Sequence, residues 1–83
     1  MELIKSEVRG IIAGIGGLPH DFDESADLYS ELKLGSFQAV DILTALEERY
    51  NVTIPDAQYT EARSLDELSR VMAALLGEHE FRP

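Results

Sequence analysis

The feature that most constrains the fold is the spacing of apolar residues, which recur every three or four positions in three separate segments. This period matches the turn of an α-helix, so each segment is predicted to form a helix with one apolar stripe. The apolar positions are Leu3, Ile4, Val8, Ile11, Ile12 and Ile15 in the first segment, Phe37, Val40, Leu43, Leu46 and Tyr50 in the second, and Leu65, Leu68, Val71, Met72, Leu75 and Leu76 in the third.

Residues that favour helix starts and stops delimit these segments. Glycines and a proline within residues 14–19 are expected to end the first helix, and Asn51 to end the second, which starts near residue 36. The third is expected to start with a capping box, in which Ser64 accepts a hydrogen bond from the amide of Glu67 and Glu67 reaches back. Gly77 is its expected end.

No segment alternates apolar and polar residues as a half-buried strand does, except briefly at residues 51–54. A further turn or two of helix is predicted around residues 57–61. We therefore expect an all-α fold, a small four-helix bundle of three main helices and one short helix, in residues 1–77. A frayed tail is expected at 78–83. The loop at 16–35 is long, and its expected anchors to the core are Leu18, Phe22, Leu28, Tyr29, Leu32 and Leu34.

Composition limits the partners of such a domain. The 83 residues carry 16 Asp and Glu against 7 Lys and Arg, a formal net charge of -9. This charge argues against binding nucleic acid or inserting into an anionic membrane, and it favours basic partners. The chain has no cysteine, which excludes disulfides and thiolate metal sites and is compatible with a cytoplasmic location. Neither a membrane-spanning run nor a signal peptide is evident.

The chain offers little for catalysis or metal binding. Neither His20 nor His79 has a second imidazole or thiol at ligand spacing. The acidic stretch at 21–27 fails as an EF-hand loop, because Ala26 stands where glycine is needed and Leu32 where glutamate is needed. No pair of carboxylates is placed for acid–base work. We therefore expect a protein that is not an enzyme and has no built metal site, with weak binding of a divalent cation by the acidic loop as the alternative.

Ser36 has a position that allows either a structural or a functional role for its hydroxyl. It follows Gly35 at the point where the long loop becomes a helix. Serine is a favoured helix cap, so its hydroxyl could simply accept a bond from a backbone amide. If Gly35 is the cap instead, the hydroxyl is free, and a helix N-terminus favours a phosphate ester there. The surrounding sequence lacks the strand–elbow–helix pattern of an esterase nucleophile.

The run of residues 27–55 resembles the core of acyl carrier proteins. The similarity rests on Ser36 followed by Phe37, on the block Leu46-Glu47-Glu48 with Tyr50, and on Ile54-Pro55. The order and length of the predicted helices extend it over nearly the whole chain. The resemblance implies that Ser36 carries 4′-phosphopantetheine, which a separate phosphopantetheinyl transferase takes from coenzyme A. The terminal thiol would hold an acyl or aminoacyl group as a thioester, and the carrier itself would catalyse nothing.

The resemblance also assigns roles around Ser36. It implies a monomer that docks on acyl-activating, acyltransferase or synthase enzymes through basic patches on those enzymes. The expected partner-binding residues are Gly35, Phe37, Val40, Asp41, Thr44, Glu47 and Glu48, and the expected acyl-chain pocket is formed by Val40, Leu43, Leu46, Ile54, Leu68 and Met72. The partner-binding residues could equally form an ordinary solvated helix face, and the pocket residues could equally be plain core packing.

Three positions depart from the family pattern. Gly35 stands where aspartate is usual, Phe37 where leucine or methionine is usual, and Thr44 where an apolar residue is common. We therefore expect a specialised carrier, serving a lipid or secondary-metabolite pathway, in place of the housekeeping carrier of fatty acid synthesis. The alternatives are a peptidyl or aminoacyl carrier, and an unmodified acidic helical interaction module in which Ser36 is only a cap.

Overall fold

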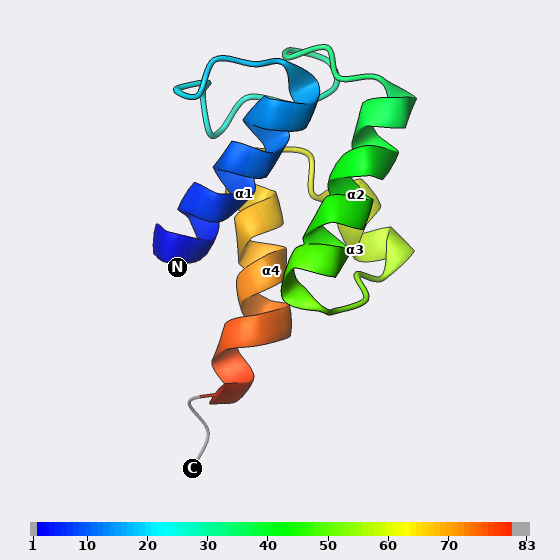
Figure 1. Cartoon of the computed structure of the whole chain (residues 1–83). Coiled ribbons are helices and arrows are strands. Elements are labelled where there is room, and N and C mark those ends of the chain that lie inside the picture. Colours follow the sequence, from blue (N-terminus) through cyan, green and yellow to red (C-terminus); the bar gives the residue numbers. More distant parts are fainter. Residues whose placement is uncertain (1, 81–83) are drawn as a thin grey trace.

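Four helices in the predicted order make up the computed structural model, which describes the backbone of residues 2–80 and the side chains of residues 3–76. The helices are α1 (Glu2–Gly16), α2 (Ser36–Tyr50), α3 (Asp56–Glu61) and α4 (Leu65–Glu80) (Figure 1). No strand occurs within residues 2–80, so the all-α fold class is confirmed. The short helix expected around residues 57–61 is present as α3.

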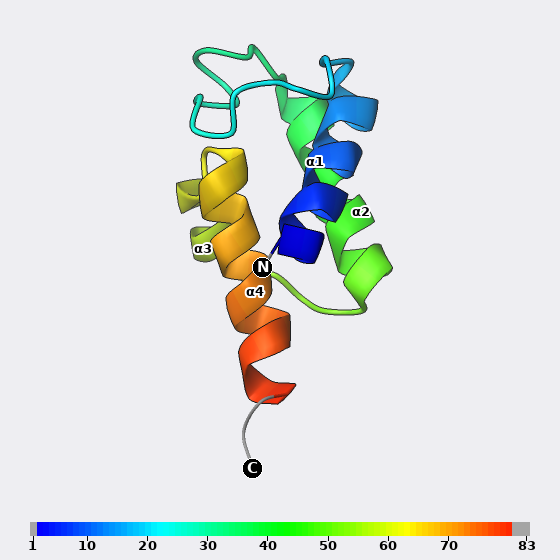
Figure 2. The ribbon, with the colours of Figure 1, turned by 90° about the vertical axis from the view of Figure 1, so that its left-hand side faces the viewer.

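α1 packs against both α2 and α4, while the short α3 packs against α4 (Figure 2). The core lies where these helices meet. Burying such large apolar side chains contributes about 1.5–3 kcal/mol each. The largest apolar side chains with almost no exposed surface are Val8 and Ile12 from α1, Leu28 from the long loop, Ile42 and Leu46 from α2, and Leu65, Leu68 and Met72 from α4.

The predicted apolar stripes differ from the packed ones at three positions. Leu3 is 73% exposed, Phe37 88% and Val40 58%, so none of these side chains belongs to the core. In α2 the buried residues are Ile42 and Leu46. Two overlapping apolar sets have helical spacing in this segment, and the one containing Ile42 faces the core.

A residue in the left-handed conformation follows the C-terminal end of both α1 and α2. Gly17 adopts a positive φ of 67° just after α1, whereas Gly14 lies inside the helix. Asn51 adopts the left-handed conformation, with φ 56°, and its amide donates to the carbonyl of Glu47, as expected of a stop. Gly16 lies so close to Leu34 that an added Cβ would be 2.6 Å from Leu34 Cδ2.

The expected end of the last helix at Gly77 is wrong, because α4 continues to Glu80. A glycine inside a helix costs only about 1 kcal/mol relative to alanine, so glycine alone does not stop it. Of the tail predicted to be frayed at 78–83, residues 81–83 lie outside the described part of the chain. That tail and the domain boundary at residue 77 stay predictions.

The start of α4 carries the predicted cap in a shifted form. Ser64 Oγ accepts a hydrogen bond from the amide of Glu67 at 3.2 Å. The Glu67 carboxylate reaches back, as expected, but it accepts from the amide of Arg63 at 2.8 Å, one residue earlier than in the usual box.

The long loop between α1 and α2 is fastened to the body of the protein. Phe22, Leu28 and Leu34 are buried, and Leu18, Tyr29 and Leu32 pack against the core, which confirms the expected anchors. The Asp27 carboxylate accepts hydrogen bonds from Arg63 Nε at 2.7 Å and Nη2 at 3.1 Å. It also accepts from the amides of Tyr29 and Ser30, at 2.8 and 2.9 Å. The Arg63 guanidinium and these amides hold the pKa of Asp27 well below its usual range.

A second set of charges ties the same loop to α1 and α4. Lys5 Nζ lies 2.7 Å from Asp66 Oδ1 and also pairs with Glu24 from the loop. The amide of Asp66 donates to the carbonyl of Glu24 at 3.0 Å. The loop is therefore anchored by ion pairs as well as by its apolar side chains.

Candidate attachment site

Ser36 is the first residue of α2 and is not its cap. Gly35 occupies the cap position with an extended backbone, φ -91° and ψ 174°. The amide of Gly35 donates to Gln38 Oε1 at 2.8 Å, so a side chain from the first turn closes this end of the helix. Ser36 is exposed, and its hydroxyl takes part in no hydrogen bond with the described residues. Of the two interpretations of Ser36, the structure supports the free hydroxyl.

The electrostatic surroundings of this hydroxyl suit an anion. The first turn of α2 contains no acidic residue, and no side chain of the cap residue occupies its amides. Unpaired amides and the helix dipole both stabilise negative charge at a helix N-terminus, typically by 0.3–1 kcal/mol at an exposed site. A phosphodiester on Ser36 would therefore sit in favourable surroundings.

The exposed face of α2 beside Ser36 carries five of the predicted partner-binding residues. Phe37 and Val40 project into solvent, and Asp41, Thr44 and Glu48 are exposed as well. The spacing of these five positions puts them on one side of the helix. Gly35 is also exposed, at the end of that face. The predicted residues are thus brought together, with one exception.

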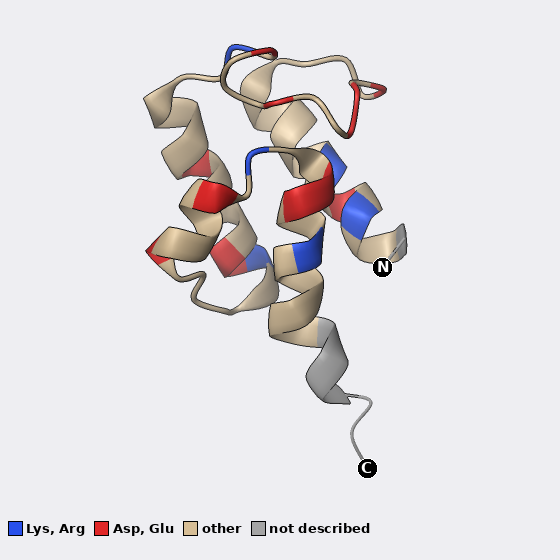
Figure 3. Ribbon diagram, turned by 180° about the vertical axis from the view of Figure 1, so that it is seen from behind, with Lys and Arg blue, Asp and Glu red and all other residues tan. Residues whose placement is uncertain are grey.

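Glu47 is the exception. It is half-buried, and its Oε2 accepts a hydrogen bond from the amide of Ile54 at 2.8 Å. Glu47 therefore fastens the turn that follows α2. The acidic residues of the chain are spread over the long loop and all parts of the bundle, and α2 carries only some of them (Figure 3).

Comparison with known protein families matches residues 6–72 to the family described as "Phosphopantetheine attachment site". The chain belongs to this family. It is thus a carrier protein for 4′-phosphopantetheine, which is bound covalently at the family's attachment site. No curated protein matches the chain.

Carrier domains of this family are not catalysts. They are served by phosphopantetheinyl transferases and by synthase or acyltransferase enzymes. Within the described part of the carrier, no helix has the length and apolarity needed to cross a bilayer.

The six residues predicted to line an acyl-chain pocket do not share one environment. Leu46, Ile54, Leu68 and Met72 are at most 2% exposed and are packed in the core of the carrier. Leu43 is half-buried against that core, and Val40 points into solvent. A cargo among the first four would have to displace packed side chains, so the acyl-chain pocket stays a prediction.

Tyr59, which the sequence did not single out, bonds to α2 three residues after Ser36. Its hydroxyl donates to the carbonyl of Ala39 in α2, with 2.6 Å between the oxygens. Beside this bond lies a cleft of about 230 Å³, lined by Tyr29, Ala39, Tyr59, Thr60 and Arg63. α3 is too short to show an apolar period, and no local pattern marks a bond between residues 20 positions apart.

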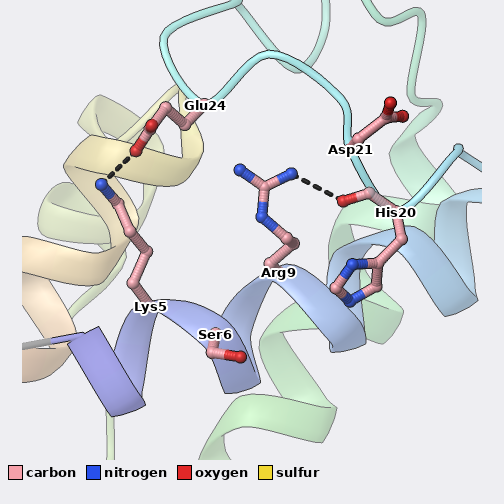
Figure 4. A pocket seen from close by; sticks show the side chains of 6 residues that line it. All are labelled: Lys5, Ser6, Arg9, His20, Asp21 and Glu24. Carbon is pink, nitrogen blue, oxygen red and sulfur yellow. Dashed lines mark hydrogen bonds and ion pairs between the residues drawn. The ribbon is translucent and has the colours of Figure 1, made fainter.

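A larger hollow of about 480 Å³ lies between α1 and the long loop, and Lys5 and Arg9 reach across it to the loop (Figure 4). Arg9 Nη1 donates to the carbonyls of His20 and Phe22, at 2.7 and 2.8 Å. Its guanidinium lies over the Phe22 ring, 4.9 Å from the centroid. Lys5, on the same helix, pairs with Glu24. These contacts hold the loop, and no cluster of metal-ligating side chains occurs among the residues described.

Proposed function

We propose that this chain is an acyl carrier protein whose cargo is held as a thioester on a 4′-phosphopantetheine arm at Ser36. The observation that carries the proposal is the exposed Ser36 hydroxyl, free of hydrogen bonds to the described residues, at the start of a helix inside the matched region. When bound, the prosthetic group supplies a terminal thiol. The chain has no cysteine, so no thiol of its own competes for the cargo.

The attachment step is a substitution at phosphorus. Ser36 Oγ forms a bond to the phosphorus that bears the pantetheine group of coenzyme A. The bond from that phosphorus to the bridging oxygen breaks, and 3′,5′-adenosine bisphosphate leaves with the electron pair. The proton of the hydroxyl passes to a base of the transferase. On the carrier, the contribution of α2 is to present the hydroxyl in solvent, next to amides that favour the new anionic phosphodiester.

The exposed face of α2 is the proposed docking surface for the enzymes that load and use the cargo. Phe37 and Val40 offer apolar area, and Asp41 and Glu48 offer charge at the same face. With a net charge of -9, the carrier is attracted to enzymes with basic patches. Exposed charge pairs speed association more than they add affinity, and salt screens them. Such contacts suit a carrier that must leave one enzyme for the next.

The departures from the family pattern favour a specialised pathway of lipid or secondary metabolism. Gly35 removes a carboxylate next to the attachment site, and Phe37 places an exposed ring where a smaller apolar residue is usual. Thr44 adds a polar group to the same face. We expect the chain to replace the housekeeping carrier of fatty acid synthesis poorly. Full replacement of that carrier in growing cells would contradict the specialised role.

The attachment can be tested by the intact mass of the purified chain after incubation with coenzyme A, magnesium and a broad-specificity transferase. We expect a gain of one phosphopantetheinyl group, absent in Ser36→Ala. Ser30→Ala, which changes another exposed serine close in the sequence, is the matched control and should still gain the group. No gain with several different transferases would contradict the proposal and favour the unmodified interaction module.

The nature of the cargo needs a second measurement. The modified chain is offered in parallel to acyl-activating enzymes with fatty acids and to amino-acid-activating enzymes with amino acids. We expect acyl groups to be accepted, because the strongly acidic surface is more typical of acyl than of aminoacyl carriers. Loading with amino acids alone would favour the aminoacyl carrier.

A further inference from the structure

Lys33, in the long loop, is an exposed cation three positions before Ser36. Most basic side chains of the carrier are engaged by other residues, through ion pairs at Lys5, Arg49 and Arg63 and through hydrogen bonds to carbonyls at Arg9. Among the basic side chains that the structure describes, only Lys33 and Arg70 form neither an ion pair nor a hydrogen bond. Lys33 is therefore a positive charge close to the attachment site that the fold itself does not use.

The backbone at Lys33 is fixed by its two neighbours. The amide of Leu32 donates to the carbonyl of Asp27, and the amide of Leu34 donates to the carbonyl of Leu28, both at 3.0 Å. Leu34 is buried, and Leu32 packs against the core. Between them Lys33 has a φ of 64°, a left-handed conformation that glycine and asparagine adopt more easily than lysine does. The loop thus holds a lysine at this surface position although a smaller residue would fit the backbone better.

The ammonium group of Lys33 is within reach of a group attached to Ser36. An extended chain advances at most about 3.6 Å per residue, so the Cα atoms of Lys33 and Ser36 are no more than about 11 Å apart. The flexible four-carbon stem of lysine can span much of that distance. Glu31, the nearest carboxylate in the sequence, accepts a hydrogen bond from the amide of Asp27 at 3.3 Å. The first turn of α2 contains no acidic residue, so no carboxylate of that turn competes for the ammonium.

We propose that Lys33 forms an ion pair with the phosphodiester of the arm on Ser36 and holds that end of the arm next to the long loop. The proposal rests on the attachment at Ser36. The phosphodiester adds negative charge to a chain whose net charge is already -9, and Lys33 offsets it at the point of attachment. Exposed ion pairs are weak and are screened by salt. The arm is therefore free to leave the loop when an enzyme takes up the cargo.

The test is phosphorus NMR of the chain after a broad-specificity transferase has loaded it from coenzyme A, with the loading verified by intact mass. We expect the phosphodiester signal to shift when salt is raised from about 0.01 M to about 1 M, because the Debye length falls from about 30 Å to about 3 Å. Lys33→Met keeps a long side chain without the charge, so the salt-dependent shift should become several-fold smaller. Lys33→Arg restores a positive charge and should retain the shift.

Two further variants separate the charge of Lys33 from its backbone and from the charge of the whole chain. Lys33→Gly removes the charge and suits the left-handed conformation, so its shift should be as small as that of Lys33→Met although the backbone strain differs. Arg70→Met is the matched control, because it removes another exposed cation without a partner among the residues described, on α4. Its salt-dependent shift should equal that of the unaltered chain.

The inference fails, while the attachment stands, if the signal of the loaded unaltered chain does not respond to salt. It also fails if Lys33→Met or Lys33→Gly keeps the full shift, or if Arg70→Met loses as much of it as Lys33→Met does. The last result would assign the shift to the overall charge. The absence of any mass gain at the loading step would instead contradict the attachment at Ser36, and this inference with it.

Discussion

Two serines stand at helix starts in this carrier, and their hydroxyls are used in opposite ways. Ser64, just before α4, is 7% exposed, and its oxygen accepts a hydrogen bond from the amide of Glu67. Ser36, the first residue of α2, is exposed and has no such bond. The start of α4 is also fastened by Arg63 and Asp66, which pair with Asp27 and Lys5. The start of α2 is closed by the bond between Gly35 and Gln38, and among the residues described no ion pair joins it to another element.

The difference comes from a shift of one position relative to the helix. Ser64 is the residue before the first helical one and points back at the amides, whereas Gly35 takes that place in α2. Glycine caps a helix almost as well as serine does but without a side chain. The serine that follows it is therefore left free to react. One helix start contributes to stability, and the other presents a chemical group.

The largest effect on stability is expected from Asp27→Ala. This substitution removes four hydrogen bonds and the ion pair that holds Arg63 next to α4. We expect a larger loss of melting temperature than from any other substitution at these two helix starts. The measurement is thermal unfolding followed by circular dichroism. An unchanged melting temperature would show that the apolar side chains and the contacts of Lys5 and Arg9 hold the loop without help from Asp27.

The same variant should alter the response to acid. The pKa of Asp27 is lowered in the folded chain, so its contribution to stability is complete above the unfolded pKa, near 3.9. That contribution is lost as the pH falls below about 4 toward the folded pKa. The unaltered chain should thus lose stability over this range more steeply than Asp27→Ala. Equal slopes would mean that other carboxylates, such as Asp66 beside Lys5, dominate the acid response.

A smaller effect on stability is expected when either of the two serines is replaced by alanine. Ser64→Ala removes a side-chain cap and should cost about 0.5–2 kcal/mol in the free energy of unfolding. Ser36→Ala, at an exposed position without a bond, should change it by less than about 0.5 kcal/mol. Urea titrations of the two variants measure both values. Similar losses in the two variants would show that the Ser36 hydroxyl does cap its helix in solution.

The smallest effect on stability is expected at Gly35. A Cβ there would meet only Gln38 Oε1, at 3.7 Å, so a side chain fits. Gly35→Asp and Gly35→Asn should each stabilise the chain by about a few tenths of a kcal/mol, since both are good caps. We expect only Gly35→Asp to speed modification by the transferase, because it restores the carboxylate typical of the family. Equal rates in both variants would contradict this role of the charge.

The order of the helices could be predicted because helical spacing of apolar residues is a local signal. The choice of the buried face in α2 could not. Phe37 and Val40 continue one apolar set and Ile42 belongs to another, and only packing against the rest of the core decides between them. The exposed apolar side chains beside Ser36 therefore looked like core residues in the sequence.

The candidate site was predictable in part for the same reason. The position of Ser36 and the possible cap at Gly35 follow from neighbouring residues, and the free hydroxyl depends on nothing distant. The bond from Tyr59 to Ala39 and the pairing of Asp27 with Arg63 join residues 20 and 36 positions apart. No local pattern encodes such bonds, because they depend on how the helices pack.

The close approach of Gly16 to Leu34 links the last turn of α1 to the residue before Gly35. Leu34 is 7% exposed, and the atom in contact is the outer end of its side chain. A methyl group at position 16 would require this side chain to move, two residues before Ser36. The packing next to Ser36 therefore depends in part on a glycine in α1, twenty residues earlier in the sequence.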